Sequence, residues 1–339
     1  MYLCSMCSSC FWYIFVVLSA VIFRLTSSSI NELETWNEQG TISAVSTTIG
    51  RRSHMEDYFI RVEGEQSGIG LYAIFDGHSG KYAASFAKKY FTKAIGDEIN
   101  LYTNAKAGSC KYAEESNHHL NFKQMLSDFI AEAESQLKEA SLQHKHDSGA
   151  TCLLVIAEKK KLTVANVGDS RGVMCDSNGI AIDLSIDHKP DNPIEKERIE
   201  KAGGKIHHWG VWRIRGLAMS RALGDNRLKL DDNIIITTPD LFTFDLDEVQ
   251  PKFMILASDG LWDVMSSQQA VNFIQKRYLW EKDFGAKALM DEAYRLQSSD
   301  NIAVLIVVFK NGYYKVARTD SRANVDPTTK DYITTKTEL

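Results

Sequence analysis

The chain has 339 residues, with 39 basic and 44 acidic side chains and 44% hydrophobic residues. This is an ordinary globular composition, and a chain of this length buries a large core without needing disulfide bonds. The net charge of −5 and the lack of a long basic run argue against a nucleic-acid-binding protein. Charge is unevenly distributed, because Arg24 is the only charged side chain before Glu32.

The N-terminal segment, residues 1–31, is predicted to be a membrane anchor. The 21 residues from Leu3 to Phe23 carry no charge, and about 20 apolar residues suffice to cross a bilayer. Arg24, Arg51 and Arg52 follow this run. By the positive-inside rule, we expect a single-pass protein with its catalytic body in the cytosol, held on an internal membrane, the endoplasmic reticulum.

Two other interpretations of this segment stay open, a cleaved signal peptide and a segment that lies in the membrane interface. A signal peptide carries basic residues before its apolar part, whereas here they follow it. The chain also lacks an Asn-x-Ser/Thr sequon. Cys4, Cys7 and Cys10 are candidates for palmitoylation, although small residues in a membrane segment need no such role.

The body, residues 32–310, shows no internal repeat and no linker, which indicates one compact domain. Tight turns join several of its strand-like runs, which favours antiparallel sheets, and two pairs of amphipathic helices interrupt the strands. The sequence therefore predicts an α+β fold with helices covering sheets. The expected strands are 42–48, 71–75, 151–157, 162–167, 172–175, 253–257 and 302–309, and the expected helical segments are 82–90, 122–137, 270–278 and 284–296.

Carboxylates recur at the ends of these strands. Asp76 and Asp259 each follow an apolar strand, and Asp300 precedes one. Asp169 lies in a turn between two strands, and the pair 56–57 follows a further strand-like segment. Taken singly, each is typical of a turn or a helix cap. If sheet edges gather them, however, a cation must offset their repulsion.

Oxygen ligands without paired Cys or His favour Mg²⁺ or Mn²⁺ over zinc. Two such ions can hold a hydroxide for in-line attack on phosphorus. The chain has no nucleotide-binding glycine loop, no nucleophile elbow and no cysteine with an arginine six positions later. Residues 244–249 resemble an aspartate nucleophile motif, but they come too late in the chain, and an edge strand with solvated acids is the plainer interpretation.

Seven motifs in this order resemble those of the metal-dependent protein serine/threonine phosphatases, the protein phosphatase 2C or PPM family. With its apolar N-terminus, the chain is most similar to a membrane-anchored member of that family. The motifs are 52–57 (Arg-Ser-His-Met-Glu-Asp), 75–78 (Phe-Asp-Gly-His), 165–172 (Ala-Asn-Val-Gly-Asp-Ser-Arg-Gly), 187–190 (Asp-His-Lys-Pro), 217–225 (Leu-Ala-Met-Ser-Arg-Ala-Leu-Gly-Asp), 256–263 (Leu-Ala-Ser-Asp-Gly-Leu-Trp-Asp) and 299–301 (Ser-Asp-Asn).

The resemblance implies a four-layer α-β-β-α sandwich with two Mg²⁺ or Mn²⁺ ions at one end of the paired sheets. Asp76 would bridge both ions. Asp259 and Asp300 would complete one site, and Glu56 and the Gly77 carbonyl would hold the other. The activity implied is hydrolysis of phosphoserine and phosphothreonine in proteins by a hydroxide that bridges the ions, without a covalent enzyme intermediate. A catalytically inactive relative that serves as a scaffold is the alternative.

The resemblance also implies roles for residues around the ions. Asp57 would act through metal-bound water, and Asp169 would share a third, weaker ion site with Asp259. Arg52 would clamp the phosphate, a task suited to a planar guanidinium. His78 would protonate the departing oxygen, because an alkoxide is a poor leaving group.

The stretch 191–215 would be a flap beside the active site, and kinases of stress signalling would be candidate substrates. Three residues depart from the family pattern, namely Ser79, Ala150 and Ala303. Ser79 is expected to cap a helix that begins near Lys81. The polar residues 311–339 are expected to form a flexible tail. Its last three residues also match a short PDZ-domain ligand, although so brief a match arises easily by chance.

Overall fold

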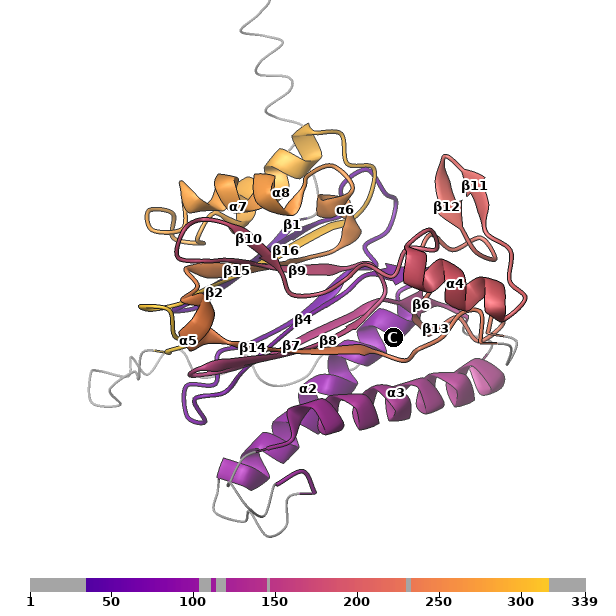
Figure 1. The fold of residues 1–339 in the computed structure, drawn as a ribbon, viewed down its shortest axis with the longest axis horizontal. Coiled ribbons are helices and arrows are strands. Elements are labelled where there is room, and N and C mark those ends of the chain that lie inside the picture. Colours follow the sequence, from indigo (N-terminus) through magenta and orange to yellow (C-terminus); the bar gives the residue numbers. More distant parts are fainter. Residues whose placement is uncertain (1–34, 104–110, 114–119, 145–146, 230–232, 317–339) are drawn as a thin grey trace, which may run out of the picture.

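The computed structural model describes residues 35–103, 111–113, 120–144, 147–229 and 233–316. The predicted anchor at 1–31 and the tail beyond residue 316 lie outside this range. Among the described residues, none of the helices is long and apolar enough to cross a membrane. Within them, two antiparallel sheets pack face to face and helices lie on both outer faces, which confirms the predicted α+β class (Figure 1).

The first sheet has six strands, and each neighbouring pair runs antiparallel. Its inner strands are buried on both faces, which explains why they are continuous apolar runs rather than alternating ones. In sheet order the strands are β1 (Thr35–Gln39), β2 (Ser43–Thr48), β16 (Ile302–Val308), β15 (Phe253–Ala257), β9 (Arg171–Cys175) and β10 (Ala181–Asp183).

The second sheet has five antiparallel strands. In order they are β14 (Asp240–Asp245), β8 (Lys161–Val167), β7 (Cys152–Glu158), β4 (Gly70–Phe75) and β3 (Tyr58–Val62). A short three-stranded sheet, β13 (Leu223–Gly224), β6 (Gly149–Ala150) and β5 (Gly77–His78), lies beyond the ends of β4 and β7. The plainer interpretation of residues 244–249 is confirmed only in part, because residues 244 and 245 end the edge strand β14 and the remaining four form the short helix α5 (Leu246–Val249).

Helices α7 (Ser267–Gln275) and α8 (Ala286–Arg295) pack on the six-stranded sheet, and α2 (Tyr82–Thr103) and α3 (Phe122–His144) pack on the five-stranded sheet (Figure 1). A third apolar core fills the space between the sheets and includes Tyr72, Met254 and Leu305. Short helices α5 (Leu246–Val249) and α6 (Asp259–Trp262) follow β14 and β15.

The predicted flap contains α4 (Pro193–Lys201) and a hairpin of β11 (His207–Trp209) and β12 (Val211–Arg213), which project from one end of the sandwich (Figure 1). The start of α4 follows local rules. The Asn192 side chain accepts a hydrogen bond from the Ile194 N–H, and Pro193 takes the first helical position.

Two local expectations are corrected by the structure. Ser79 does not cap α2; it adopts a left-handed backbone with φ of 58°, and the Ser148 hydroxyl accepts the Ala83 N–H at 3.0 Å instead. The packed chain also extends past Lys310, because Tyr314 is buried and donates a hydrogen bond to the Glu63 carbonyl. The polarity of the local sequence could not predict either feature, because each depends on a hydrogen-bond partner far along the chain.

Candidate active site

Most of the predicted site residues line one cavity of about 820 Å³ at the end of the sheets. Asp76 follows β4, Asp259 opens α6 directly after β15, and Asp300 precedes β16, so adjacent strand ends deliver the three carboxylates. The flap closes one side of the cavity with His208 and Trp212. The predicted residues in the lining are Arg52, Glu56, Asp76, Gly77, His78, Asp259 and Asp300.

Hydrogen bonds and one close backbone approach connect the segments at the strand ends. The Asp76 N–H donates to the Thr151 hydroxyl at 2.9 Å, and the Asp259 N–H points at Asp76 Oδ2 at 3.4 Å. A Cβ placed on Gly77 would come within 2.4 Å of the Glu56 carbonyl oxygen. Glycine at this position therefore lets the two segments approach.

Burial perturbs the carboxyl groups of the site. Burial, and to a smaller extent the charges of Asp300 and Asp259, raise the pKa of Asp57 to about 8 against the opposing effect of a Ser258 hydrogen bond. The pKa values of Asp76 and Asp259 also lie well above the usual range, first because of burial and then because of neighbouring carboxylates. Negative charge on these groups is therefore unfavourable unless a cation offsets it.

Two carboxylates at the site form ion pairs with basic side chains of the protein. Arg52 Nη2 lies 2.5 Å from Asp300 Oδ2, and Lys189 Nζ lies 2.5 Å from Asp169 Oδ2. Asp169 is fully buried, and its second oxygen, Oδ1, has no hydrogen-bond partner among the residues that the structure describes. Burial lowers the pKa of Lys189, but the charges of Asp169 and Asp259 outweigh it and the net shift is upward.

The donor chemistry fits a hard divalent cation, because the clustered groups are oxygens and their pKa values are raised by burial and by neighbouring carboxylates. In the part of the chain that the structure describes, no group of three or more His, Cys, Asp or Glu side chains stands ready to hold a metal ion. In the structure, Arg52 and Lys189 instead bind the carboxylates of Asp300 and Asp169, for which a metal ion would have to compete. The role of each ligand stays a prediction.

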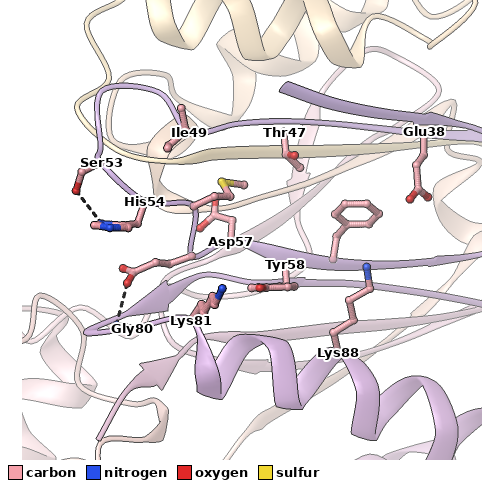
Figure 2. Close-up of a pocket in the computed structure, with 13 residues that line it drawn as sticks. Glu38, Thr47, Ile49, Ser53, His54, Asp57, Tyr58, Gly80, Lys81 and Lys88 are labelled. Atoms are coloured by element: carbon pink, nitrogen blue, oxygen red, sulfur yellow. Dashed lines mark hydrogen bonds between the residues drawn. The ribbon is translucent and has the colours of Figure 1, made fainter. Parts of the chain in front are cut away.

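Asp57 and Asp169 do not line this cavity. Asp57 belongs to a neighbouring cavity of about 860 Å³ between β1, β2, β3 and the start of α2, shown in Figure 2. The Glu56 carboxylate accepts the Gly80 N–H at 2.8 Å on this side (Figure 2). Residues 52–57 thus contribute to both cavities, and Asp169 reaches the active-site cavity through Lys189.

Several neighbours of the site lie in the family motifs but were assigned no role from the sequence. Ser258 donates to Asp57 Oδ2 at 2.7 Å, and His78 Nε2 lies 2.7 Å from Asp225 Oδ2. Lys189 and Asp225 lie in motifs of the family, but only the assembled sheets show which side chains they touch. In the flap, the rings of His207 and His208 pack on Trp209 and Trp212, respectively.

Comparisons with known proteins agree with this geometry. The family model described as "Protein phosphatase 2C" matches residues 43–302. "Protein phosphatase 1L" of Bos taurus is 42% identical over 294 residues, which cover 85% of this chain and 79% of the relative. "Probable protein phosphatase 2C 59" of Oryza sativa subsp. japonica is 38% identical, over 77% of this chain and 73% of the relative.

A solved structure shows the same fold. The crystal structure of serine-threonine phosphatase 2C from Toxoplasma gondii superposes with a TM-score of 0.66 at 26% identity, over 82% of this chain and 99% of that one. The match to "Protein phosphatase 1L" agrees with the predicted family resemblance. From its strand-end carboxylates, its fold and these matches, the chain belongs to the protein phosphatase 2C family of protein serine/threonine phosphatases.

Proposed function

We propose that this phosphatase hydrolyses phosphoserine and phosphothreonine in proteins with the help of Mg²⁺ or Mn²⁺. The observation that carries the proposal is the single cavity in which buried carboxylates, Arg52 and His78 face a common space beside the flap. The cavity holds a donor set for cations, a guanidinium for a phosphate and an imidazole for a leaving oxygen.

Bound divalent cations would offset the buried carboxylates, polarise the phosphoryl oxygens and lower the pKa of water. The side chains of the site would each have a separate role. Asp76, Asp259, Asp300 and Glu56 would hold the two cations, with Asp169 and Asp259 at a third position. Arg52, whose side chain is 54% exposed, reaches into the cavity from its pair with Asp300 and would hold the phosphate. His78 would give a proton to the departing oxygen.

The substrates proposed are phosphoproteins, with kinases of stress cascades as candidates. The cavity suits a phosphorylated side chain that projects from a protein, because the flap side of the cavity carries the exposed apolar side chains of Val211 and Trp212. These apolar side chains would contact residues on either side of the phosphorylated one.

Turnover of a phosphothreonine peptide is expected to depend on added cation. In EDTA we expect a loss of about 100-fold or more, since the transition state loses its main electrostatic stabilisation, and Mn²⁺ or Mg²⁺ should restore the rate. A steady-state assay with titrated metal measures this. Unchanged turnover in EDTA would refute the metal assignment, whereas no turnover with either ion would favour the inactive scaffold.

We further propose that residues 1–31 anchor the protein in a membrane, the endoplasmic reticulum, with the catalytic domain in the cytosol. The support is the charge-free run from Leu3 to Phe23 followed by basic residues.

Carbonate extraction of cells that express the full chain should leave the protein in the membrane pellet. Val17→Arg should release a large fraction, because a central arginine costs about 2.5 to 3.5 kcal/mol of insertion free energy. Ser28→Arg, outside the apolar run, is the matched control and should stay in the pellet. Recovery of the wild-type chain in the supernatant would refute the anchor, and a shortened mature chain would indicate a signal peptide.

A further inference from the structure

His78, the predicted proton donor, has a buried carboxylate partner. His78 Nε2 lies 2.7 Å from Asp225 Oδ2, and the Asp225 side chain is only 2% exposed. A carboxylate taken out of water must be paired, since its desolvation is costly otherwise. The two residues stand 147 positions apart in the chain, so the fold has brought them together.

The small sheet of β5, β6 and β13 brings His78 and Asp225 together. His78 on β5 and Gly224 on β13 both pair with Gly149 of the central strand β6. Asp225 follows Gly224 directly, so its side chain meets the histidine ring over Gly149. A Cβ on Gly149 would lie 2.2 Å from Asp225 Oδ2 and 2.4 Å from His78 Nε2. The absence of a side chain at position 149 is therefore what leaves space for the pair.

The backbone at Asp225 is held firmly in an uncommon conformation. Its φ is +53°, in the left-handed region that only a few per cent of non-glycine residues adopt. The Leu228 N–H donates to the Asp225 carbonyl at 2.8 Å, and the Gly224 N–H donates to Glu134 Oε2 on α3 at 2.8 Å. Such a conformation costs free energy and persists where the surroundings determine it, often at functional sites.

The ring of His78 keeps one nitrogen without a partner. Nδ1 is buried and makes no hydrogen bond among the described residues, whereas Nε2 faces an acceptor-only carboxylate and must carry a hydrogen to bond it. A buried polar atom without a partner is costly unless another molecule supplies the bond. His78 also lines the active-site cavity.

We propose that Asp225 is a positioning residue that holds the His78 ring through Nε2, so that Nδ1 gives its proton to the serine or threonine oxygen. As the oxygen–phosphorus bond breaks, the electron pair stays on the departing oxygen and the ring proton binds there. The water that adds to phosphorus supplies the oxygen of the phosphate and a proton that returns to the ring. This inference rests on the proposed phosphatase reaction and adds a partner for its acid.

Asp225→Asn tests the inference, because it keeps the size of the side chain and removes its charge. On a phosphothreonine peptide we expect kcat to fall by about 10- to 100-fold, a part of the 10²- to 10⁴-fold typical of general acid catalysis, with KM little changed. On p-nitrophenyl phosphate, whose leaving group needs no proton, the fall should be below about threefold. His78→Gln should show the same contrast between substrates. Asp147→Asn, a neighbouring aspartate that pairs with Arg227 rather than His78, is the matched control and should leave both rates unchanged.

A metal-free readout separates positioning from folding. In ¹⁵N-histidine spectra of the full chain, wild type should show a hydrogen-bonded Nε2–H signal that is absent in His78→Gln, displaced in Asp225→Asn and unmoved in Asp147→Asn. Equal losses of kcat on both substrates, or a His78 signal that Asp225→Asn does not move, would overturn the proposal. If Asp225→Asn fails to fold, the wild-type spectrum alone tests the proposal. Absence of a hydrogen-bonded Nε2–H signal from His78 would then exclude the His78–Asp225 pair. A wild-type chain without turnover would instead refute the proposed function.

Discussion

Asp76→Asn is expected to lower turnover of a phosphothreonine peptide by about 1,000-fold, the upper range for loss of a central electrostatic contact at a reacting centre. Asp76 is the carboxylate predicted to bridge both cations, and it interacts with the charge of Asp57 and with the Asp259 N–H. An amide there keeps the shape of the side chain but removes the negative charge that two cations would share.

The same substitution should make the metal-free protein more stable than wild type. Burial and the neighbouring carboxylates raise the pKa of Asp76 well above its usual range in the folded state, so above the unfolded pKa this carboxyl group costs stability, and asparagine removes that cost. The midpoint of thermal unfolding in EDTA should therefore rise. Saturating Mn²⁺ should stabilise wild type, by about 2.7 kcal/mol at one hundred times the dissociation constant, and the variant far less.

Asp247→Asn is the control for this experiment, because Asp247 lies on the surface at α5 and pairs with Lys160. It should keep both its turnover and its response to Mn²⁺. An Asp76→Asn protein that keeps wild-type turnover, or the full stabilisation by Mn²⁺, would refute the bridging role.

Glu195→Ala is expected to lower the free energy of unfolding by about 3 to 5 kcal/mol, the usual cost of breaking a buried ion pair on one side. The Glu195 side chain on α4 is only 2% exposed. Its oxygens lie 2.5 Å from Arg221 Nη2 and 2.8 Å from Arg198 Nη2, and the Ser220 hydroxyl donates to it at 2.6 Å. Without the carboxylate, the two guanidinium groups would face each other around an empty site.

This cluster should also make stability depend on pH. Burial raises the pKa of Glu195, but the hydrogen bonds and charges of Arg221, Arg198 and Ser220 outweigh it and lower the pKa from 4.5 to about 2. The group therefore stabilises the folded state fully above pH 4.5, and this contribution of about 3 kcal/mol is lost as the pH falls through 2. Denaturant unfolding between pH 6 and pH 2 measures both effects.

Glu200→Ala on the same helix is the matched control. Glu200 is exposed and its nearest partner, Lys196, lies 4.0 Å away, so the change should cost less than about 1 kcal/mol. Equal losses for Glu195→Ala and Glu200→Ala, or an acid-unfolding profile that Glu195→Gln leaves unaltered, would show that the cluster does not stabilise the fold.

The predicted elements were confirmed where the local pattern is strong. Residues 253–257 form β15 as expected, and the strands expected near 71–75 and 302–309 differ from β4 and β16 by one residue at one end. Long apolar runs leave a chain few alternatives to a buried strand. The edge strand β1 and the short flap elements were missed, since each has few apolar residues and depends on its neighbours for pairing.

The sequence by itself determined that carboxylates stand at the ends of apolar strands, because this needs only the order of residues along each segment. From that order, and from the family motifs, the fold class and the cavity-lining residues Asp76, Asp259 and Asp300 followed. Tertiary structure alone decided which side chains touch. His78 meets Asp225 and Tyr314 reaches Glu63 only after the sheets assemble. The physical reason is that contacts across more than a hundred residues depend on sheet order and register, which no local pattern of hydrophobic and charged residues encodes.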